Sequence, residues 1–338
     1  MKLIVQIPAF NEEATIAQVI RDVPRRIDGI DRVEVLVVDD GSTDGTVAEA
    51  RAAGADHIVS LPLNRGLAFA FQAGLDAGLR LGADLIVNTD GDHQYPGEYI
   101  PALIKPILNR TADLVIGDRQ VSQIEHFSAQ KRLLERFGSW IVRMASGTGV
   151  PDAPSGFRAY SREAALRLFV TSDFSYTLDN LIQAGKRGLK VAHIPISTNP
   201  TRPSKLHRGS WHFVKRQAAT IARAYATYEP LKTFFYLSLP FWLLAAVLFI
   251  RLMVIFISRD FSLPGNVQSL IVAVMALIVG FLVLIFGLLA DRIGESRRLM
   301  EEILYRQRRA EIERLPGHTS PRATGETPAA GNTEAADQ

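Results

Sequence analysis

Two carboxylates follow a short apolar run in the N-terminal half of the chain. The run Leu85–Val87 is typical of a buried strand, and Asp90-Gly91-Asp92 comes directly after it. Carboxylates one residue apart on an extended backbone point to the same side. Their hard oxygens suit Mg²⁺ or Mn²⁺ carrying a diphosphate. The alternative is a solvated acidic loop, because Asp-x-Asp alone is a short motif with many chance matches.

These carboxylates need a scaffold, and the first 120 residues alternate short apolar runs with helical patterns. Helices are expected over about 16–23, 46–53 and 67–81. This order predicts an α/β fold with a mostly parallel sheet and flanking helices, which binds ligands beyond the carboxyl ends of its strands. The expected strands are Leu3–Ile7, Val33–Val38, His57–Leu61, Leu85–Asn88 and Leu114–Ile116.

Polar loops follow several of these strands. Asp39–Asp44 contains good helix caps, so a capping role is one interpretation. A cap does not require the two further carboxylates Asp39 and Asp40 at the strand end. The loops Pro8–Glu13 and Asn64–Gly66 fall at the same expected edge of the sheet. The set therefore favours a ligand site over isolated turns.

With these motifs in this order, residues 1–230 resemble the inverting family 2 glycosyltransferases. That family has the GT-A fold, a Rossmann-like sheet, and the narrower resemblance is to polyprenyl-phosphate (dolichol- or undecaprenyl-phosphate) hexosyltransferases. The resemblance implies a nucleotide-sugar donor and assigns residues to its pocket. The nucleotide-sugar residues implied are Pro8, Asn11, Glu13, Asp39, Asp40, Arg65, Gly66 and Asp90.

The resemblance also implies that Asp90 and Asp92 carry the metal and the diphosphate, with Gln94 near the metal. Family members often have Ala and Leu where this chain has Gly91 and His93. His93 is either an added ligand or a hydrogen-bonding neighbour of the acids.

A lipid phosphate acceptor would be dianionic or nearly so, and it must approach a negatively charged donor diphosphate. Arg and Lys are needed to offset that repulsion. Asp152 matches a family position discussed as a base, so it is a possible base or orienting group, or a simple cap before Ser155. The expected phosphate and acceptor residues are Arg119, Lys131, Ser155, Arg158, Arg202, Ser204 and Lys205.

The C-terminal part changes character. A hairpin over 231–290 is expected, because segments 234–257 and 268–290 are each apolar enough to cross a bilayer. Basic residues flank it on both sides, so the positive-inside rule puts the catalytic domain and both termini in the cytoplasm. Residues 130–146 and 209–228 are expected to be interfacial amphipathic helices, with ordinary packing on the sheet as the alternative. Residues 291–315 are expected to form a cytoplasmic basic helix on the lipid surface, and 316–338 a disordered tail.

Composition narrows the function classes. The chain has no cysteine, which excludes disulfides, thiolate metal sites and cysteine nucleophiles. Its net charge of +3 gives no case for a nucleic-acid partner. We therefore expect a metal-dependent glycosyltransferase of the cell membrane that moves one hexose from a UDP- or GDP-sugar to a polyprenyl phosphate. A homo-oligomer is compatible with this expectation. The alternatives are a processive polysaccharide synthase, although the chain has no Gln-x-x-Arg-Trp motif, and a catalytically dead scaffold of the same fold.

Overall fold

The computed structural model describes residues 1–120, 143, 146–170, 176–200, 229–258 and 267–314. Its N-terminal part is built on a seven-stranded sheet of order β3-β2-β1-β4-β6-β5-β7. Every pairing is parallel except those of β6, which runs antiparallel to β4 and β5. The strands are β1 Lys2–Ala9, β2 Arg32–Asp39, β3 His57–Ser60, β4 Leu85–Asn88, β5 Leu114–Asp118, β6 Arg158–Ser161 and β7 Val191–Pro195.

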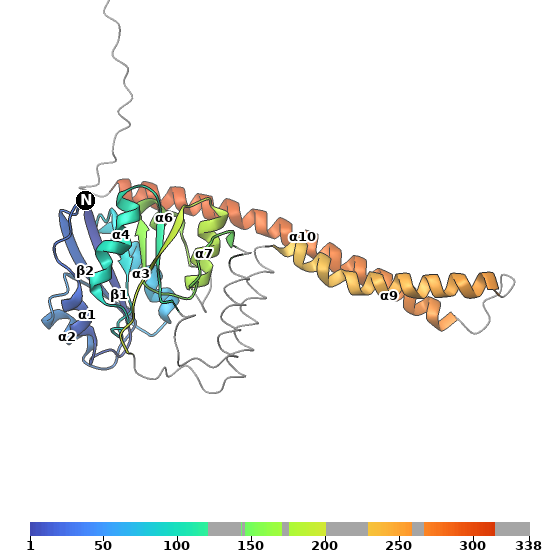
Figure 1. Ribbon diagram of the computed structural model, residues 1–338, viewed down its shortest axis with the longest axis horizontal. Coiled ribbons are helices and arrows are strands. Elements are labelled where there is room, and N and C mark those ends of the chain that lie inside the picture. The colour runs from blue at the N-terminus through green and yellow to red at the C-terminus, as the bar shows by residue number, and fades with distance from the viewer. Residues whose placement is uncertain (121–142, 144–145, 171–175, 201–228, 259–266, 315–338) are drawn as a thin grey trace, which may run out of the picture.

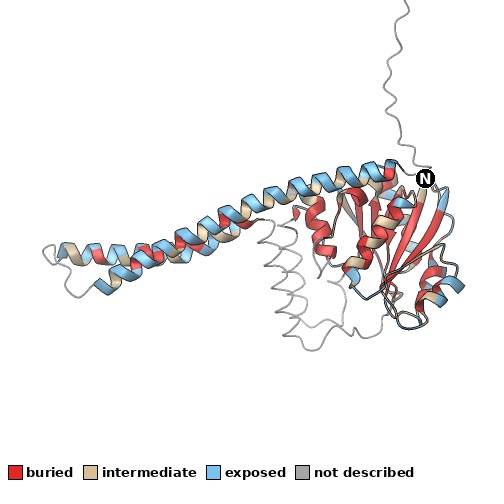
Figure 2. Ribbon diagram, turned by 180° about the vertical axis from the view of Figure 1, so that it is seen from behind, coloured by how far each residue is buried: buried red, intermediate tan, exposed pale blue. Residues whose placement is uncertain are grey.

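Helices cover both faces of this sheet, as Figure 1 shows. Side chains alternate along each buried strand, so Ile4 enters one core cluster while its neighbours Leu3 and Val5 enter the other. Figure 2 shows the sheet buried between the helices. The helices are α1 Ile16–Asp22, α2 Thr46–Ala52, α3 Leu67–Arg80, η1 Gly97–Tyr99, α4 Ile100–Leu108, α6 Arg162–Arg167 and α7 Tyr176–Lys186.

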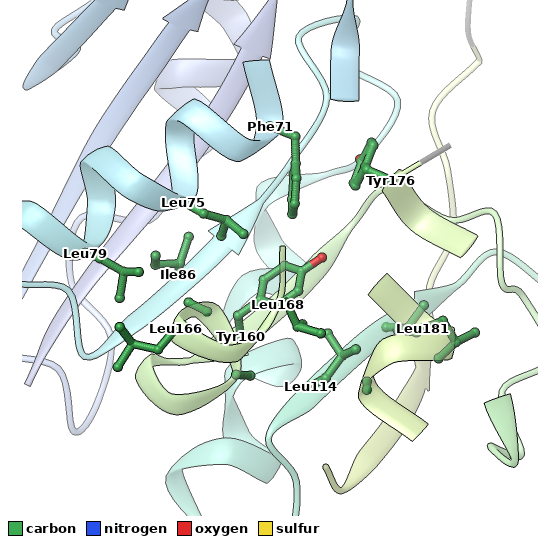
Figure 3. Packing of buried hydrophobic residues seen from close by; sticks show 14 of the residues in the cluster. Phe71, Leu75, Leu79, Ile86, Leu114, Tyr160, Leu166, Leu168, Tyr176 and Leu181 are labelled. Atoms are coloured by element: carbon green, nitrogen blue, oxygen red, sulfur yellow. The ribbon is translucent and has the colours of Figure 1, made fainter. Parts of the chain in front are cut away.

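The core beneath α3 is rich in aromatic side chains. The ring of Phe71 on α3 stacks on Tyr176 with centroids 4.1 Å apart, and it lies 5.8 Å from the ring of Tyr160 on β6 (Figure 3). Aromatic pairs of this kind contribute beyond their buried area. They tie α3, β6 and α7 together behind the carboxyl edge of the sheet.

The structure confirms the expected α/β fold and all five expected strands, with ends shifted by at most two residues. The sequence analysis missed β6, whose four residues carry no apolar run. The expected boundaries of the catalytic domain stay a prediction. The expected helices 130–146 (apart from Arg143 and Ser146) and 209–228, together with the tail 316–338, lie outside the described residues.

Two long helices follow the sheet, α9 Pro230–Ser258 and α10 Val267–Glu313, and both are long and apolar enough to cross a membrane. They lie side by side as a hairpin (Figure 1). A Cβ atom on Gly280 would lie only 2.3 Å from the Trp242 ring, and one on Gly287 would lie 2.6 Å from Phe234. These glycines therefore allow aromatic side chains of α9 to pack directly on the α10 backbone.

The expected basic helix over 291–315 is corrected in one respect. It is not separate from the second span, because α10 continues without a break to Glu313. Its far half packs on α6 and reaches α3 (Figure 1). Arg308 pairs there with Asp76, and Ile312 is buried in the core. Apolar burial and ion pairing therefore attach this part of α10 to the catalytic domain, and its contact with lipid stays a prediction.

Candidate active site

The polar loops meet at one edge of the sheet because β1, β2, β4 and β5 are parallel and end there. β6 runs the other way, so the loop that precedes Arg158 reaches the same edge. β1 lies between β2 and β4, which places a topological switch point beside it. Open α/β sheets bind ligands in the crevice outside such a point.

Asp90 is a strongly perturbed carboxyl group at this edge. Its Oδ1 atom is buried and accepts no hydrogen bond from any described residue. Burial and, after it, the negative charge of Asp92 together raise the pKa of Asp90 to about 7 against the opposing charges of Arg119 and Arg158. A buried carboxylate oxygen without a partner is costly. A cation bound at Asp90 would remove that cost.

A glycine allows this carboxylate to sit where it does. A Cβ atom on Gly156 would lie 3.0 Å from both carboxylate oxygens of Asp90. The Gly156 peptide is held on both sides: its N–H donates to the Tyr95 hydroxyl at 3.3 Å, and its carbonyl accepts from Asn88 Nδ2 at 2.8 Å. Gly156 is therefore a fixed wall of the Asp90 pocket.

Hard oxygen donors at this site fit a divalent cation. Asp90 and Asp92 supply carboxylates, and the backbone N–H of Gln94 donates to Asp92 Oδ1 at 3.1 Å, which orders the loop. Among the described residues no three acidic or histidine side chains converge as a complete metal cage. Mg²⁺ in particular is usually held by one or two carboxylates, and substrate phosphates and waters complete its coordination. The residues present fit that kind of site.

His93 is engaged away from the two acids. Its Nε2 contacts Asp22 of α1, and its Nδ1 lies 3.4 Å from the Asn199 amide. The backbone at His93 is left-handed, with φ of 61°. Of the two interpretations of this residue, the geometry favours the hydrogen-bonding neighbour, because both ring nitrogens already have partners, Asp22 and Asn199.

The predicted nucleotide residues lie in loops that they themselves hold together. Asp40 accepts the backbone N–H groups of Arg65 and Gly66, both at 2.8 Å. Asn11 Oδ1 accepts the Thr43 N–H at 2.9 Å. These bonds join the loops after β1, β2 and β3 into one rim.

The other members of this set lie on the same rim. Asp39 accepts the Ser42 N–H at 3.0 Å, and Glu13 accepts the Gly45 N–H at 3.2 Å. The Pro8 carbonyl lies 3.3 Å from where a Cβ on Gly91 would stand. The eight predicted nucleotide-sugar residues are thus brought to one edge, although their contacts with a nucleotide stay a prediction.

Arg119 and Asp152 form a two-pronged ion pair. Arg119 Nε and Nη2 each donate to one Asp152 oxygen at 2.8 Å, and the Arg119 backbone N–H donates at 3.0 Å. Asp152 is buried, with 4 % of its surface exposed. Both of its oxygens accept from Arg119, so this geometry favours the orienting role over a side-chain cap on Ser155, and a role as a base stays a prediction.

Arg158 also differs from its expected role. It is fully buried and donates to the backbone carbonyls of Ser155, Ala153 and Thr177 at 2.6 to 2.8 Å. It therefore braces the loop instead of facing a phosphate. Ser155 is buried too, and its hydroxyl has no hydrogen-bond partner among the described residues. Lys131, Arg202, Ser204 and Lys205 lie outside the described residues.

Sequence reasoning did not assign roles to Asn88, Tyr95, Gly156 and Tyr176, which shape the pocket around Asp90. Asn88 carried a usable signal, because it is a lone amide that ends an apolar strand. A buried amide must find partners, and it donates to Gly156 and to the Tyr176 hydroxyl. The tyrosines gave no such signal in the sequence.

The fold and this edge define a sugar-nucleotide transferase of the GT-A type. Residues 4–169 match the family described as glycosyl transferase family 2. A dolichyl-phosphate hexose transferase from Haloferax volcanii is 35 % identical over 57 % of this chain and 81 % of that protein. The chain belongs to glycosyltransferase family 2, and it is a glycosyltransferase.

Two further proteins are similar to it. An undecaprenyl-phosphate mannosyltransferase from Micrococcus luteus is 30 % identical over 58 % of this chain and 83 % of that protein. The crystal structure of glucosyl-3-phosphoglycerate synthase from Mycobacterium tuberculosis with Mn²⁺, UDP and glucosyl-3-phosphoglycerate superposes with a TM-score of 0.52 at 28 % identity, over 67 % of this chain and 79 % of that one. Divalent metal and UDP thus accompany this fold in a solved neighbour.

Proposed function

We propose that this protein transfers one hexose from a nucleotide-sugar to a polyprenyl phosphate, with inversion at the anomeric carbon. The observation that carries the proposal is the buried, unpartnered Oδ1 of Asp90 beside Asp92, in a chain that also has two membrane-length helices. The similar transferases whose names specify dolichyl or undecaprenyl phosphate support the acceptor class. The two helices support an enzyme held at its lipid substrate.

On the donor side, Asp90 and Asp92 would hold Mg²⁺ or Mn²⁺ against the diphosphate. The cation supplies Lewis-acid stabilisation of the departing nucleoside diphosphate. Asp40 and Asn11 fix the rim on which the nucleotide would lie. Gly156 has no side chain, so it leaves room for the Asp90 carboxylate at the site.

On the acceptor side, a phosphate oxygen would form the new bond to the anomeric carbon while the bond from that carbon to the diphosphate breaks. A lipid phosphate is already ionised at pH 7, so the reaction needs positioning and charge more than a general base. Arg119, held by Asp152, provides a fixed positive charge near Asp90. Because the reaction has little need of a general base, it is compatible with an Asp152 whose two oxygens both accept from Arg119.

The membrane side of the proposal follows from the hairpin. The residues that flank it are basic, which favours a catalytic domain and termini in the cytoplasm of a cell and an acceptor in the cytoplasmic leaflet. The donor sugar, its nucleotide and the length of the lipid are open in this proposal. A homo-oligomer remains compatible with it.

A transfer assay tests the proposal. Purified protein in detergent is incubated with Mn²⁺ or Mg²⁺, polyprenyl phosphate, and a panel of labelled UDP- and GDP-sugars. We expect one donor to give a labelled, acid-labile lipid, and Asp92→Asn to abolish it. If no donor labels the lipid, the proposed function is wrong. Metal-dependent donor binding without transfer would instead favour the scaffold alternative.

A further inference from the structure

We propose that residues 291–313, the part of α10 beyond the second span and here named the strut, lock the catalytic domain at one fixed position over the membrane. The attachment of the strut to the catalytic domain is here named the lock. Its consequence for sugar transfer rests on the proposed function, whereas the lock itself does not. α10 is one helix of 47 residues. About 20 residues suffice to cross a bilayer, and at 1.5 Å per residue the strut is about 35 Å long.

One face of the strut carries most of the contacts described below. Glu301, Tyr305, Arg308 and Ile312 recur at spacings of three and four residues, which places them on one side of a helix. Met300, Ile303 and Arg306 lie on the other faces and are exposed. A helix that crossed the domain by chance would not keep its contacts in register over three turns.

The first contact of the strut with the catalytic domain is a largely buried ion pair at Glu301. Arg187, which follows α7, donates to Glu301 Oε2 at 2.6 Å, and Arg297 of the strut donates to Glu301 Oε1 at 2.9 Å. Glu301 keeps only 14 % of its side chain exposed. Two guanidinium groups on one screened carboxylate make a stronger attachment than a surface pair.

The middle of the strut binds α6. The Tyr305 hydroxyl donates to Glu163 Oε1 at 3.0 Å. Arg308 donates to the carbonyls of Leu166 and Leu168 at 3.2 Å, where α6 ends, and it pairs with Asp76 of α3. These carbonyls have no following helical turn to bond, so Arg308 acts as their cap.

The end of the strut enters the core. Ile312 is 5 % exposed and belongs to the same cluster as Leu79 of α3. Next to it, Glu311 accepts from Arg80 at 3.0 Å. An apolar side chain buried in the domain core makes the attachment part of the fold and distinguishes it from charge contact alone.

The lock reaches the site through α3. This helix begins at Leu67, directly after Arg65 and Gly66, whose N–H groups hold Asp40. Its other end is the one that the strut grips. The strut therefore fixes the domain from the side opposite the catalytic edge and leaves that edge open. The phosphate of a lipid acceptor stays at the height of the headgroups. A catalytic domain held at a fixed position would keep Asp90 within reach of that phosphate.

Spin-label distances in the full-length protein test the lock without any turnover. The chain has no native cysteine, so Lys105→Cys on α4 and Leu243→Cys on α9 give a clean label pair. In lipid nanodiscs we expect one narrow distance distribution. Ile312→Asp should broaden it, because a charge cannot stay in the core. Ile303→Asp is the matched control, the same change at a position that is 63 % exposed on the same helix, and should leave it narrow.

A second pair keeps the test decisive if Ile312→Asp impairs folding. Arg308→Ala should also broaden the distribution, and Arg306→Ala, which removes only a pair within the helix, should not. A broad distribution in the unsubstituted label pair, or a narrow one in both Ile312→Asp and Arg308→Ala, would overturn the lock.

Activity then tests the consequence. Ile312→Asp should slow transfer to long-chain polyprenyl phosphate in vesicles about tenfold or more, since misplacement costs rate steeply. Transfer to a water-soluble short-chain prenyl phosphate should be unchanged. Equal loss with both acceptors would contradict a positioning role. Absence of transfer by the wild type would count against the proposed function, while the distances would still decide the lock.

Discussion

The most informative single residue is Asp90, whose carboxylate lies in an unfavourable environment that a bound cation would relieve. Its pKa of about 7 lies far above the ordinary value of 3.8 because of burial and the neighbouring Asp92. The folded chain thus binds a proton there more tightly than the unfolded chain does. Without metal, this group makes folding less favourable as pH rises from about 4 to about 7.

Metal affinity should consequently depend on pH, because a cation competes with that proton. With a pKa near 7, we expect Mn²⁺ to bind roughly tenfold more weakly at pH 6 than at pH 8. Titration calorimetry at the two pH values measures this directly. Glu98→Gln, an exposed change a few residues away, should keep the same pH dependence. Equal affinity at both pH values would contradict the assignment of Asp90 as a ligand.

Arg158 shows how a charged residue can be mistaken for a ligand group. Its guanidinium donates to three backbone carbonyls, so Arg158→Ala removes a donor from three buried acceptors. We expect a loss of about 3 kcal/mol in the free energy of unfolding. Urea unfolding in detergent measures it, with the exposed Arg51→Ala as a control expected within about 0.5 kcal/mol of wild type. Unchanged stability with weaker acceptor binding would restore Arg158 to the phosphate set.

The sequence indicated the position of Asp90 and Asp92 because strand ends and acidic loops are local features. It did not indicate that Arg158 is buried or that Asp152 is fully occupied by Arg119. Both facts depend on β6, a short strand inserted between β4 and β5 from far along the chain. Nothing in Arg158–Ser161 alone predicts that insertion, since its stability comes from its neighbours in the sheet.

At the scale of elements, the loop before β6 is the wall of the candidate site, and Gly156 is its closest point. An added methyl group would stand 2.9 Å from the Tyr176 hydroxyl and 3.0 Å from Asp90. We expect Gly156→Ala to lower kcat by about tenfold to a hundredfold, because the carboxylate must move. Steady-state kinetics measure it. Gly149→Ala, with no atom within 4 Å of its added Cβ, should be normal; equal rates for the two variants would remove Gly156 from the site.

The membrane hairpin makes its own prediction. Gly280→Ala would push a Cβ into the Trp242 ring and separate α9 from α10. Overpacking of this kind costs about 1–3 kcal/mol. We expect a lower melting temperature in detergent for Gly280→Ala and no loss for Gly294→Ala, whose Cβ would meet nothing within 4 Å. A Gly280→Ala protein as stable as wild type would contradict the packing of this hairpin.

At the scale of the whole molecule, the sequence predicted a catalytic domain followed by two spans, and α9 and α10 are long and apolar enough to be those spans. It could not show what the Arg- and Glu-rich end of α10 contacts. Acidic and basic residues four apart, such as Arg297 and Glu301, are compatible with water, lipid headgroups or protein. Only the folded arrangement shows that Glu301 pairs with Arg187 and that Ile312 is buried in the core.

The nature of the nucleophile is the most direct test of what this enzyme does. The measurement compares sugar transfer to a polyprenyl phosphate and to the matching polyprenol, in one preparation, with the donor found by the panel and Mn²⁺ present. We predict a glycosylated product from the phosphate alone, and none from either acceptor with Asp90→Asn. Equal transfer to the alcohol, or transfer that survives Asp90→Asn, would contradict a cation held by Asp90 and Asp92 and a lipid phosphate as the attacking group.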